Sequence, residues 1–335
     1  MNQTLNGIRR ILITILVAMG VGALFIVAIG ENPIDAYAAL FRGAFDGELR
    51  LGTTLAGFTP LLLTSIAFAV AAKAGAFNVG VEGEVFLGGI TAAYIGINWT
   101  FLPKPALYVA CFVGAMVVAA AWAFIPAVLR AYYNVNEVCT TILMNTVALY
   151  ITSYLVSGPM SAGTANAQSL PVTLRLYQFM KPSSVNVGIF IAAITVIVII
   201  FMLQKSSWGY KIRTVGLNPT HADYVGIDSK KVFIGAMMLS GMLGGMAGCI
   251  EVLGVHGYFL NNFATGLGSN GMLAALIVKN NMVSTPFMAF FLAVLKSGAM
   301  GMQQSTGVPK SLVDTITAVF IIIATMETAF QFAKK

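Results

Sequence analysis

The chain has 335 residues, of which 58% are hydrophobic and only 9% are charged, and its net charge is +7. These values exclude a soluble globular domain and indicate an all-α polytopic membrane protein. The basic balance does not indicate nucleic-acid binding, because cytoplasmic loops of membrane proteins are rich in Lys and Arg. The three cysteines share no CxxC spacing, so neither a disulfide framework nor a metal site is expected.

Ten apolar runs are long enough to cross a bilayer. They fall at about 11–29, 55–72, 80–99, 105–129, 137–157, 186–204, 232–254, 267–283, 285–302 and 311–330. Ten crossings place both termini on one side, and the segments assigned to that side carry twelve Lys and Arg against six opposite. This excess predicts cytoplasmic termini and a single transmembrane domain over residues 1–335. Arg9 and Arg10 precede the first run without a cleavage site soon after it, so a retained span is expected.

Residues 32–45 predict a helix outside the membrane core. Asn32 can cap it and Pro33 suits its first position. Its apolar residues lie on one side, namely Ile34, Tyr37, Ala38, Phe41 and Phe45. We expect an interfacial helix against the outer leaflet, where membrane lipid is its neighbour. A second outer segment, 158–185, is broken by prolines and is either a docking site for an extracellular partner or a passive loop.

The third apolar run opens with two carboxylates, Glu82 and Glu84, in the segment FNVGVEGEVFLGG. Placing carboxylates in a membrane is costly unless water, backbone amides or a cavity receive them. Gly80 and Gly83 allow the backbone to break and to offer unpaired amides to a polar solute. The segment predicts part of a polar pathway, with acids that merely cap the span at the membrane surface as an equal alternative.

The fifth run opens with the polar segment NVNEVCTTILMN. Glu137, Thr141 and Asn145 recur every four residues, so they share one helix face. That face is expected to look into protein or water. Hydrogen bonding between helices explains these residues at least as well as contact with solute.

The seventh run carries small residues at helical spacing, Gly241, Gly244, Gly245 and Gly248. They predict close packing between helices. Glu251 follows them and is expected at the outer end of a pathway. Two histidines, His221 and His256, have no partner at metal or catalytic spacing in the sequence.

An internal symmetry is possible between the two halves of the chain. Spans two to five match spans seven to ten in number, and the third span of each set is interrupted by glycine. The second such segment reads TGLGSNGMLAAL. An odd number of elements separates the two segments, so they run in opposite directions, as in an inverted repeat.

The polar interval from Lys205 to Lys231 is basic, which predicts a cytoplasmic loop. Asn218 can cap a helix, Pro219 suits its first position and Gly226 can end it. A helix of about two turns is too short to be stable alone, so it must pack against something. Ala222 and the pair 224–225 are the surfaces that it offers. We expect a partner to deliver force here, with a solvated connector touching anionic lipid as the alternative.

Catalytic motifs are missing from the sequence. It contains no GxxxxGK[ST], no HExxH and no GxSxG, so it shows neither a nucleotide-hydrolysing loop nor a recognisable catalytic centre. Any dependence on ATP must come from another subunit.

Several segments together resemble one known family. AGAFNVGVEGEVFLGG is similar to the signature F-N-I-G-x-E-G-Q, NEVCTTILMN to N-E-V-x-x-T-x-x-x-N, and VGLNPTHADYVGI to a cytoplasmic loop of the same family. The family comprises permease subunits of bacterial ATP-binding-cassette (ABC) importers for nucleosides and simple sugars, related to ribose and branched-chain amino-acid permeases. The resemblance implies a type II-like importer fold in the inner membrane, two permease subunits, two ATPases that bind ATP and Mg²⁺, and an extracytoplasmic binding protein. No cofactor is implied in this chain.

The resemblance also assigns roles to particular residues. A coupling helix that docks on the ATPase would fall on Arg213, Gly216, Asn218, Pro219, His221, Ala222, Asp223, Tyr224, Gly226 and Ile227. The substrate pathway would include Phe77, Asn78, Gly80, Glu82, Gly83 and Glu84, to which the polar patterns above add Glu137, Thr141, Asn145 and Glu251. Glu84 stands where the family usually has Gln. The resemblance favours nucleosides over sugars, and a pair of two different permeases.

Two other interpretations remain open from the sequence. In a stand-alone secondary transporter, Glu82, Glu84 and Glu137 would be proton or cation sites. A structural membrane scaffold is a third interpretation, but it leaves the intramembrane carboxylates and the glycine-broken segments without a purpose.

Overall fold

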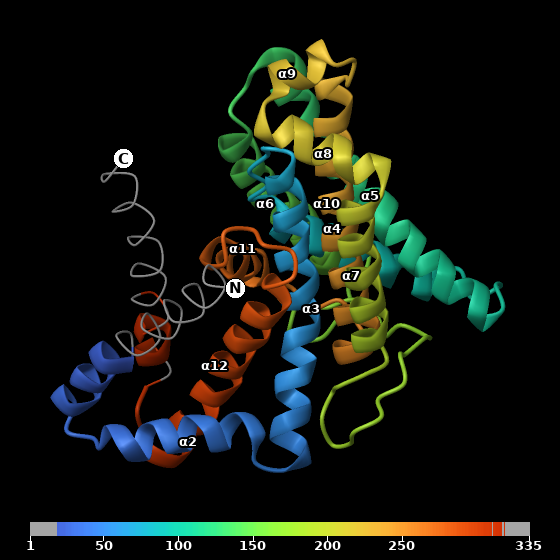
Figure 1. Ribbon diagram of the computed structural model, residues 1–335. Coiled ribbons are helices and arrows are strands. Elements are labelled where there is room, and N and C mark those ends of the chain that lie inside the picture. Colours follow the sequence, from blue (N-terminus) through green and yellow to red (C-terminus); the bar gives the residue numbers. More distant parts are fainter. Residues whose placement is uncertain (1–18, 310, 317, 319–335) are drawn as a thin grey trace, which may run out of the picture. The chain divides into compact units, whose positions relative to one another are not determined.

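The computed structural model describes residues 19–309, 311–316 and 318, and within them the regular elements are all helical (Figure 1). A first helix covers Met19–Ala28. It is followed by α2 (Pro33–Phe45), α3 (Gly47–Lys73), α4 (Val81–Asn98), α5 (Lys104–Tyr133), α6 (Glu137–Ser157), α7 (Gly188–Lys205), α8 (Ser207–Leu217), α9 (Pro219–Tyr224), α10 (Ser229–Ile250), the π-helix η1 (Glu251–His256), α11 (Leu267–Ile277) and α12 (Thr285–Thr306). The predicted all-α class is therefore confirmed.

The chain forms two compact units, one of residues 1–54 with 291–335 and one of residues 55–290. In the larger unit, α10 packs along both α4 and α5, and the core is formed by residues such as Phe68, Val85 and Ile250. In the smaller unit, the core includes Ile26 and Met302.

Glycines bring the helices of the larger unit close together. A Cβ at Gly241 of α10 would lie 2.7 Å from the carbonyl oxygen of Ala119 in α5, and Gly88 of α4 lies directly against Gly245 of α10. Larger side chains at these positions would force the helices apart. The close packing predicted for the glycines of the seventh run is therefore confirmed.

Six helices among the described residues are long and apolar enough to cross a membrane. They are Gly47–Lys73, Lys104–Tyr133, Glu137–Ser157, Gly188–Lys205, Ser229–His256 and Thr285–Thr306, and a seventh candidate is the pair Met19–Ala28 and Pro33–Phe45, bent by 116°. A protein with several membrane-spanning helices is thus confirmed, whereas the predicted count of ten is not.

The expected spans that are not long or apolar enough to cross a membrane fail for different reasons. The run at 80–99 forms α4, but its first turn carries two carboxylates, which lower its hydropathy. The run at 267–283 forms the 11-residue α11, only about 16 Å long at about 1.5 Å per residue, against a hydrocarbon core of about 30 Å. Residues 11–18 of the first run and most of the last run, with Arg9 and Arg10, lie outside the described residues.

The polar ends of the larger unit lie opposite each other. Helices α8 and α9 gather at one end, and the long connection between α6 and α7 lies at the other (Figure 1). The three cysteines are free, and Cys111 and Cys249 are buried. Cys139 is exposed on α6.

Candidate functional site

A buried hydrogen-bond network holds the segment before α4 against α10. Asn78 Nδ2 donates to Glu84 Oε1 and to Ser240 Oγ, both at 2.9 Å, and Asn78 Oδ1 accepts from the N–H of Gly80. Asn78 is 0% exposed and Glu84 is 1% exposed. The second oxygen of Glu84 is buried without a hydrogen-bond partner. Glu84 therefore lies inside the helix packing, which favours neither the capping alternative nor an open position on a water-filled route.

Glu82 lies at a different contact, between the first turns of α4 and α11. Its side chain is half-buried, and its Oε2 accepts a hydrogen bond of 3.4 Å from Ser269. A Cβ at Gly268 would lie 2.6 Å from the backbone nitrogen of Glu82. The two glycine-containing segments that the symmetry argument paired are thus in direct contact.

The polar face of α6 contacts the same segment. Asn145 Nδ2 donates to the carbonyl of Val79 at 2.9 Å, and Asn145 Oδ1 accepts from the N–H of Gly83 at 2.8 Å. Thr141 is 1% exposed and packs against Gly80. Both residues therefore hold the broken backbone before α4, and the predicted common face of α6 is confirmed. The geometry is that of hydrogen bonding between elements.

Two further pathway residues have local partners. Glu137 forms a salt bridge of 3.2 Å with Arg130 at the turn between α5 and α6. Phe77 packs edge-on against Phe68, with ring centroids 4.9 Å apart. Neither side chain stands free in an open passage.

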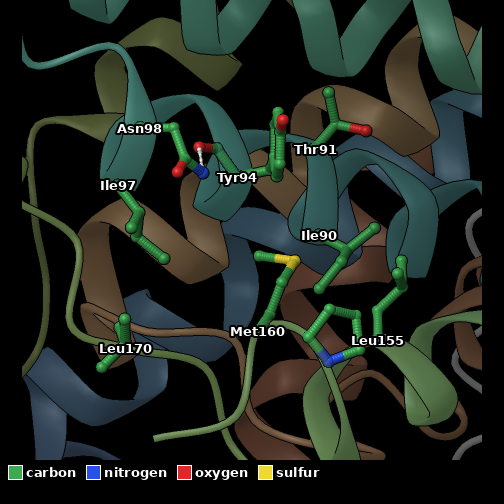
Figure 2. A pocket seen from close by; sticks show the side chains of 9 residues that line it. Ile90, Thr91, Tyr94, Ile97, Asn98, Leu155, Met160 and Leu170 are labelled. Carbon is green, nitrogen blue, oxygen red and sulfur yellow. Dashed lines mark hydrogen bonds between the residues drawn. The ribbon is translucent and has the colours of Figure 1, made fainter.

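A cavity of about 420 Å³ lies at the other end of α4 (Figure 2). It is lined by Ile90, Thr91, Tyr94, Ile97 and Asn98 of α4 together with Leu155, Pro159, Met160 and Leu170. The sequence analysis missed this cavity, although Thr91, Tyr94 and Asn98 recur at helical spacing and so share a face. Its walls are mainly apolar, with an aromatic ring and polar groups from α4, and Asn98 Nδ2 is held by the carbonyl of Tyr94.

Glu251 and His256 form a pair that the sequence analysis did not foresee. Their carboxylate and imidazole are 3.6 Å apart, because a π-helix places residues i and i+5 on one face. The expectation that His256 is isolated is therefore wrong. Glu251 is only 8% exposed, so its carboxylate does not lie open at the outer end.

The connection between α6 and α7 supports this π-helix. Leu176 N–H donates to the carbonyl of Leu253 at 2.9 Å, and Gln178 Nε2 donates to that of Gly254 at 2.9 Å. Arg175 donates to the carbonyl of His256 at 2.8 Å. The connection is therefore a built part of the larger unit rather than a loose loop.

The predicted short helix in the basic loop is confirmed as α9. Asn218 Oδ1 accepts from the N–H of His221 at 3.0 Å, and Pro219 occupies the first turn. The turn that follows contains Gly226 at φ +81°, a left-handed conformation that glycine adopts readily. The capping and stop residues thus act as the sequence predicted.

The two surfaces offered by α9 have different uses. Ala222 is 0% exposed and packs in the core of the larger unit, together with Ile227. Tyr224 is 86% exposed and Val225 is 54% exposed. The helix is thus anchored from inside by Ala222, and an aromatic and an apolar side chain are exposed at its C-terminal end.

Helix α8 is fixed by two other residues of the basic loop. Arg213 donates from its guanidinium to the carbonyl of Leu203 at the end of α7. Gly216 lies directly against the carbonyl of Lys73 at the end of α3. Only glycine permits this approach, so α8 is in contact with the segment that leads to Asn78.

Acidic caps join α9 to α10. Asp223 accepts hydrogen bonds from the N–H and the hydroxyl of Ser229, both at 2.9 Å. Asp228 caps α10 by accepting from the N–H of Lys231, and hydrogen bonds from Lys231 hold the pKa of Asp228 below its usual value. Asp223 of α9 is thus tied directly to Ser229, the first residue of α10.

Comparison with known proteins adds independent information. Residues 50–325 match the family described as "Branched-chain amino acid transport system / permease component". The chain belongs to this permease family. The permease is 33% identical over 330 residues to the guanosine ABC transporter permease protein NupP of Bacillus subtilis, covering 96% of this chain and 94% of that protein.

Two further relatives are similar over nearly the same length. The glucose ABC transporter permease protein TsgB13 of Haloferax volcanii is 32% identical over 95% of this chain and 87% of its own length. The nucleoside ABC transporter permease protein NupB of Lactococcus lactis is 31% identical over 96% of this chain and 91% of its own length. The permease is thus a transport component of the ABC class, which confirms the predicted family.

Proposed function

We propose that this permease is the membrane subunit of an ATP-driven importer that moves nucleosides across the plasma membrane. The observation that carries the proposal is the similarity, over 96% of the chain, to permeases named for guanosine and for nucleosides. Solute would be delivered by an extracytoplasmic binding protein, which would set the affinity. ATP and Mg²⁺ would be bound by the partner ATPases.

The cavity around Tyr94 could hold a nucleoside during its passage through the permease. A nucleobase stacks on an aromatic ring, and the apolar walls match its faces. We expect Tyr94→Leu to lower the maximal uptake rate several-fold and Tyr94→Phe, which keeps the ring, to retain it. The concentration for half-maximal uptake should stay constant in both, because the binding protein would determine it.

The exposed pair Tyr224 and Val225, at the C-terminal end of α9, is proposed to dock on the ATPase. Its aromatic and apolar character suits a groove on a partner, where such side chains contribute most of the binding free energy. Asn218 and Gly226 would define the helix ends, while Pro219, His221 and Asp223 would keep its geometry. Ala222 and Ile227 would act only from inside.

A chain of contacts could carry the movement of α9 to the pathway. Helix α8 is in contact with α9. Gly216 of α8 lies against Lys73, which is four residues before Phe77. The segment 74–80 then enters the network of Asn78 and Glu84. Rocking of two permeases against each other would open the route alternately to either side.

The finer architecture is also proposed rather than observed. The contact of Glu82 with Gly268 and Ser269 supports an inverted repeat, since both segments are glycine-broken and begin a helix there. Ten membrane crossings would require α4, the region of α11 and both terminal runs to complete the bundle. Both termini would then be cytoplasmic, in a bacterial inner membrane.

A second, different permease is the proposed neighbour in the membrane. Helix α6 exposes the large apolar residues Leu143, Tyr150 and Tyr154, at 65%, 70% and 73%. Lipid or the second permease would cover this face. Cysteine cross-linking from the naturally exposed Cys139 would show which of the two it is.

The first experiment is purification of the tagged permease from its native membrane in mild detergent, with identification of stoichiometric partners by mass spectrometry. A second permease and an ATPase with a phosphate-binding loop are expected. The purified complex, reconstituted with its binding protein, should then take up labelled guanosine in an ATP-dependent manner that excess unlabelled glucose does not inhibit.

Other outcomes would favour the remaining candidates. Uptake of glucose and not of guanosine would favour a sugar importer, for which the similarity to TsgB13 is the specific observation. A single polypeptide whose uptake follows the proton gradient without ATP would instead support a secondary transporter.

A further inference from the structure

The smaller unit contains a charged cavity that has no part in the transport route proposed above. It has a volume of about 280 Å³ and is lined by Asp35, Ala38, Ala39, Arg42 and Asp46, by Arg50, and by Ser305 and Thr306. At about 30 Å³ for a water molecule, this space holds about nine waters or one small polar group. The cavity is therefore large enough for a small polar ligand but too small for a segment of a partner protein.

The four charged side chains around this cavity are not satisfied by the protein. Within the described part of the chain, Asp35, Arg42, Asp46 and Arg50 take part in none of the ion pairs, and their side chains form none of the hydrogen bonds. Asp35 in the first turn of α2 and Arg42 in the last are favourable for the helix dipole. That effect explains their presence on α2, but not why Arg50 of α3 faces the same space.

The cavity lies beside a stripe that suits the membrane. Ile34, Phe41 and Phe45 of α2 are 77%, 52% and 43% exposed. Asp35, Arg42 and Asp46 each follow one of these apolar residues by one position. They therefore form a second stripe, rotated by about 100° around the helix axis from the apolar stripe. The opposite side, with Leu40 and Ala44, is buried. The charged stripe thus separates the exposed apolar stripe from the buried face.

The charges define the kind of ligand. Two guanidinium groups can bind a phosphate through paired N–H groups, and two carboxylates can accept hydrogen bonds from an ammonium group. The formal charges of the four side chains cancel, so a zwitterion fits better than an anion. A phosphate and an ammonium joined by a short linker, next to apolar side chains, describe one abundant class of molecule.

We propose that this cavity binds the phosphoethanolamine headgroup of a membrane phospholipid, with its acyl chains along Ile34, Phe41 and Phe45. The phosphate lies between Arg42 and Arg50, and the ammonium lies against Asp35 and Asp46. The inference does not depend on which solute the permease transports.

Lipid retention by the full-length permease tests the proposal. The purified protein is exchanged into detergent with equal amounts of phosphatidylethanolamine and phosphatidylglycerol, and bound lipid is counted by native mass spectrometry. We expect preferential retention of phosphatidylethanolamine and at least a tenfold loss of it in Arg42→Gln/Arg50→Gln. The control Lys104→Gln/Lys181→Gln, at exposed basic residues of the other unit, should retain it.

A second variant keeps the test informative if the arginine variant folds poorly. Asp35→Asn/Asp46→Asn makes the cavity cationic, so its preference should change to phosphatidylglycerol. A gain of binding cannot come from misfolding. Equal retention of both lipids by all variants would overturn the proposal. Saturation by soluble glycerophosphoethanolamine at the concentration effective for the lipid would overturn the assignment to a membrane lipid.

Discussion

Asn78 donates a hydrogen bond of 2.9 Å to Glu84, and the two side chains are 0% and 1% exposed. The other N–H of the Asn78 amide donates to Ser240 of α10, so both N–H groups of this side chain are paired. The carboxyl group of Glu84 thus serves as an acceptor inside a helix interface. An uncharged acceptor of the same shape could serve equally well.

Glu84→Gln is therefore expected to fold and to transport nearly as the wild type does. The amide oxygen can accept from Asn78, and the amide nitrogen is left without a partner only where the carboxyl oxygen that it replaces already has none. Glu84→Ala removes the acceptor and leaves a buried N–H of Asn78 unpaired, which costs about 1–3 kcal/mol of stability. The thermal midpoint of the purified permease and the uptake rate of the reconstituted complex measure both effects.

Glu82→Gln is the matched control, since this half-buried side chain makes one long hydrogen bond to Ser269. Its stability should be unchanged. If Glu84→Gln folded normally but abolished uptake, the acid itself would take part in transport, and the structural role argued for Glu84 would be wrong.

Much of the fold could be predicted from the sequence because each element carries its own signal. The capping residues Asn32 and Asn218, the stop at Gly226 and the apolar runs act locally, and the helices begin and end where these residues predict. The span count could not be predicted, because run length does not reveal where a helix ends. The predicted run 267–283 continues through Lys279 and Asn280, but both residues adopt positive φ and α11 ends at Ile277.

The residues of the network around Asn78 were predictable from the sequence, but their partners were not, and neither was the cavity around Tyr94. The four-residue spacing gave the common face of Thr141 and Asn145, but the sequence did not say that this face meets Val79 and Gly83. The pairing of Glu251 with His256 depends on a π-helix, and no residue type in the sequence predicts a π-helix. Long-range contacts of this kind follow only from tertiary packing.

Asn145→Ala is expected to be among the most damaging single substitutions on α6. It leaves a backbone carbonyl at Val79 and an N–H at Gly83 without partners, each at about 1–3 kcal/mol. We expect a lower thermal midpoint and little assembled complex. Asn166→Ala, at an exposed position of the connection between α6 and α7, is the control and should behave as wild type. Equal stability of the two variants would show that water replaces the lost bonds and that the site is more open than described.

Asn218→Ala tests the helix that is proposed to dock on the ATPase. Loss of an N-cap destabilises a helix by about 0.5–2 kcal/mol, and α9 has only six residues. Hydrogen exchange at residues 219–224 should become faster, and solute-stimulated ATP hydrolysis should fall. Asn218→Ser keeps a capping oxygen and should retain both properties. Faster exchange in Asn218→Ala with full ATPase stimulation would contradict the role of α9 in coupling.

Gly268→Leu tests the contact between the first turns of α4 and α11. A Cβ at this position would lie 2.6 Å from the backbone nitrogen of Glu82 and 2.8 Å from its Cβ, so a larger side chain must push the two turns apart. The backbone of Glu82 cannot rotate away as a flexible side chain can. We therefore expect loss of transport together with a lower thermal midpoint of the purified permease. Gly57→Leu is the control within α3, since a Cβ there meets nothing within 4 Å. Leucine also favours a helix over glycine by up to about 1 kcal/mol, so the control should be at least as stable as wild type. If Gly268→Leu were as stable and active as Gly57→Leu, the two segments would not be in contact in the working permease, and the support for an inverted repeat would be lost with it.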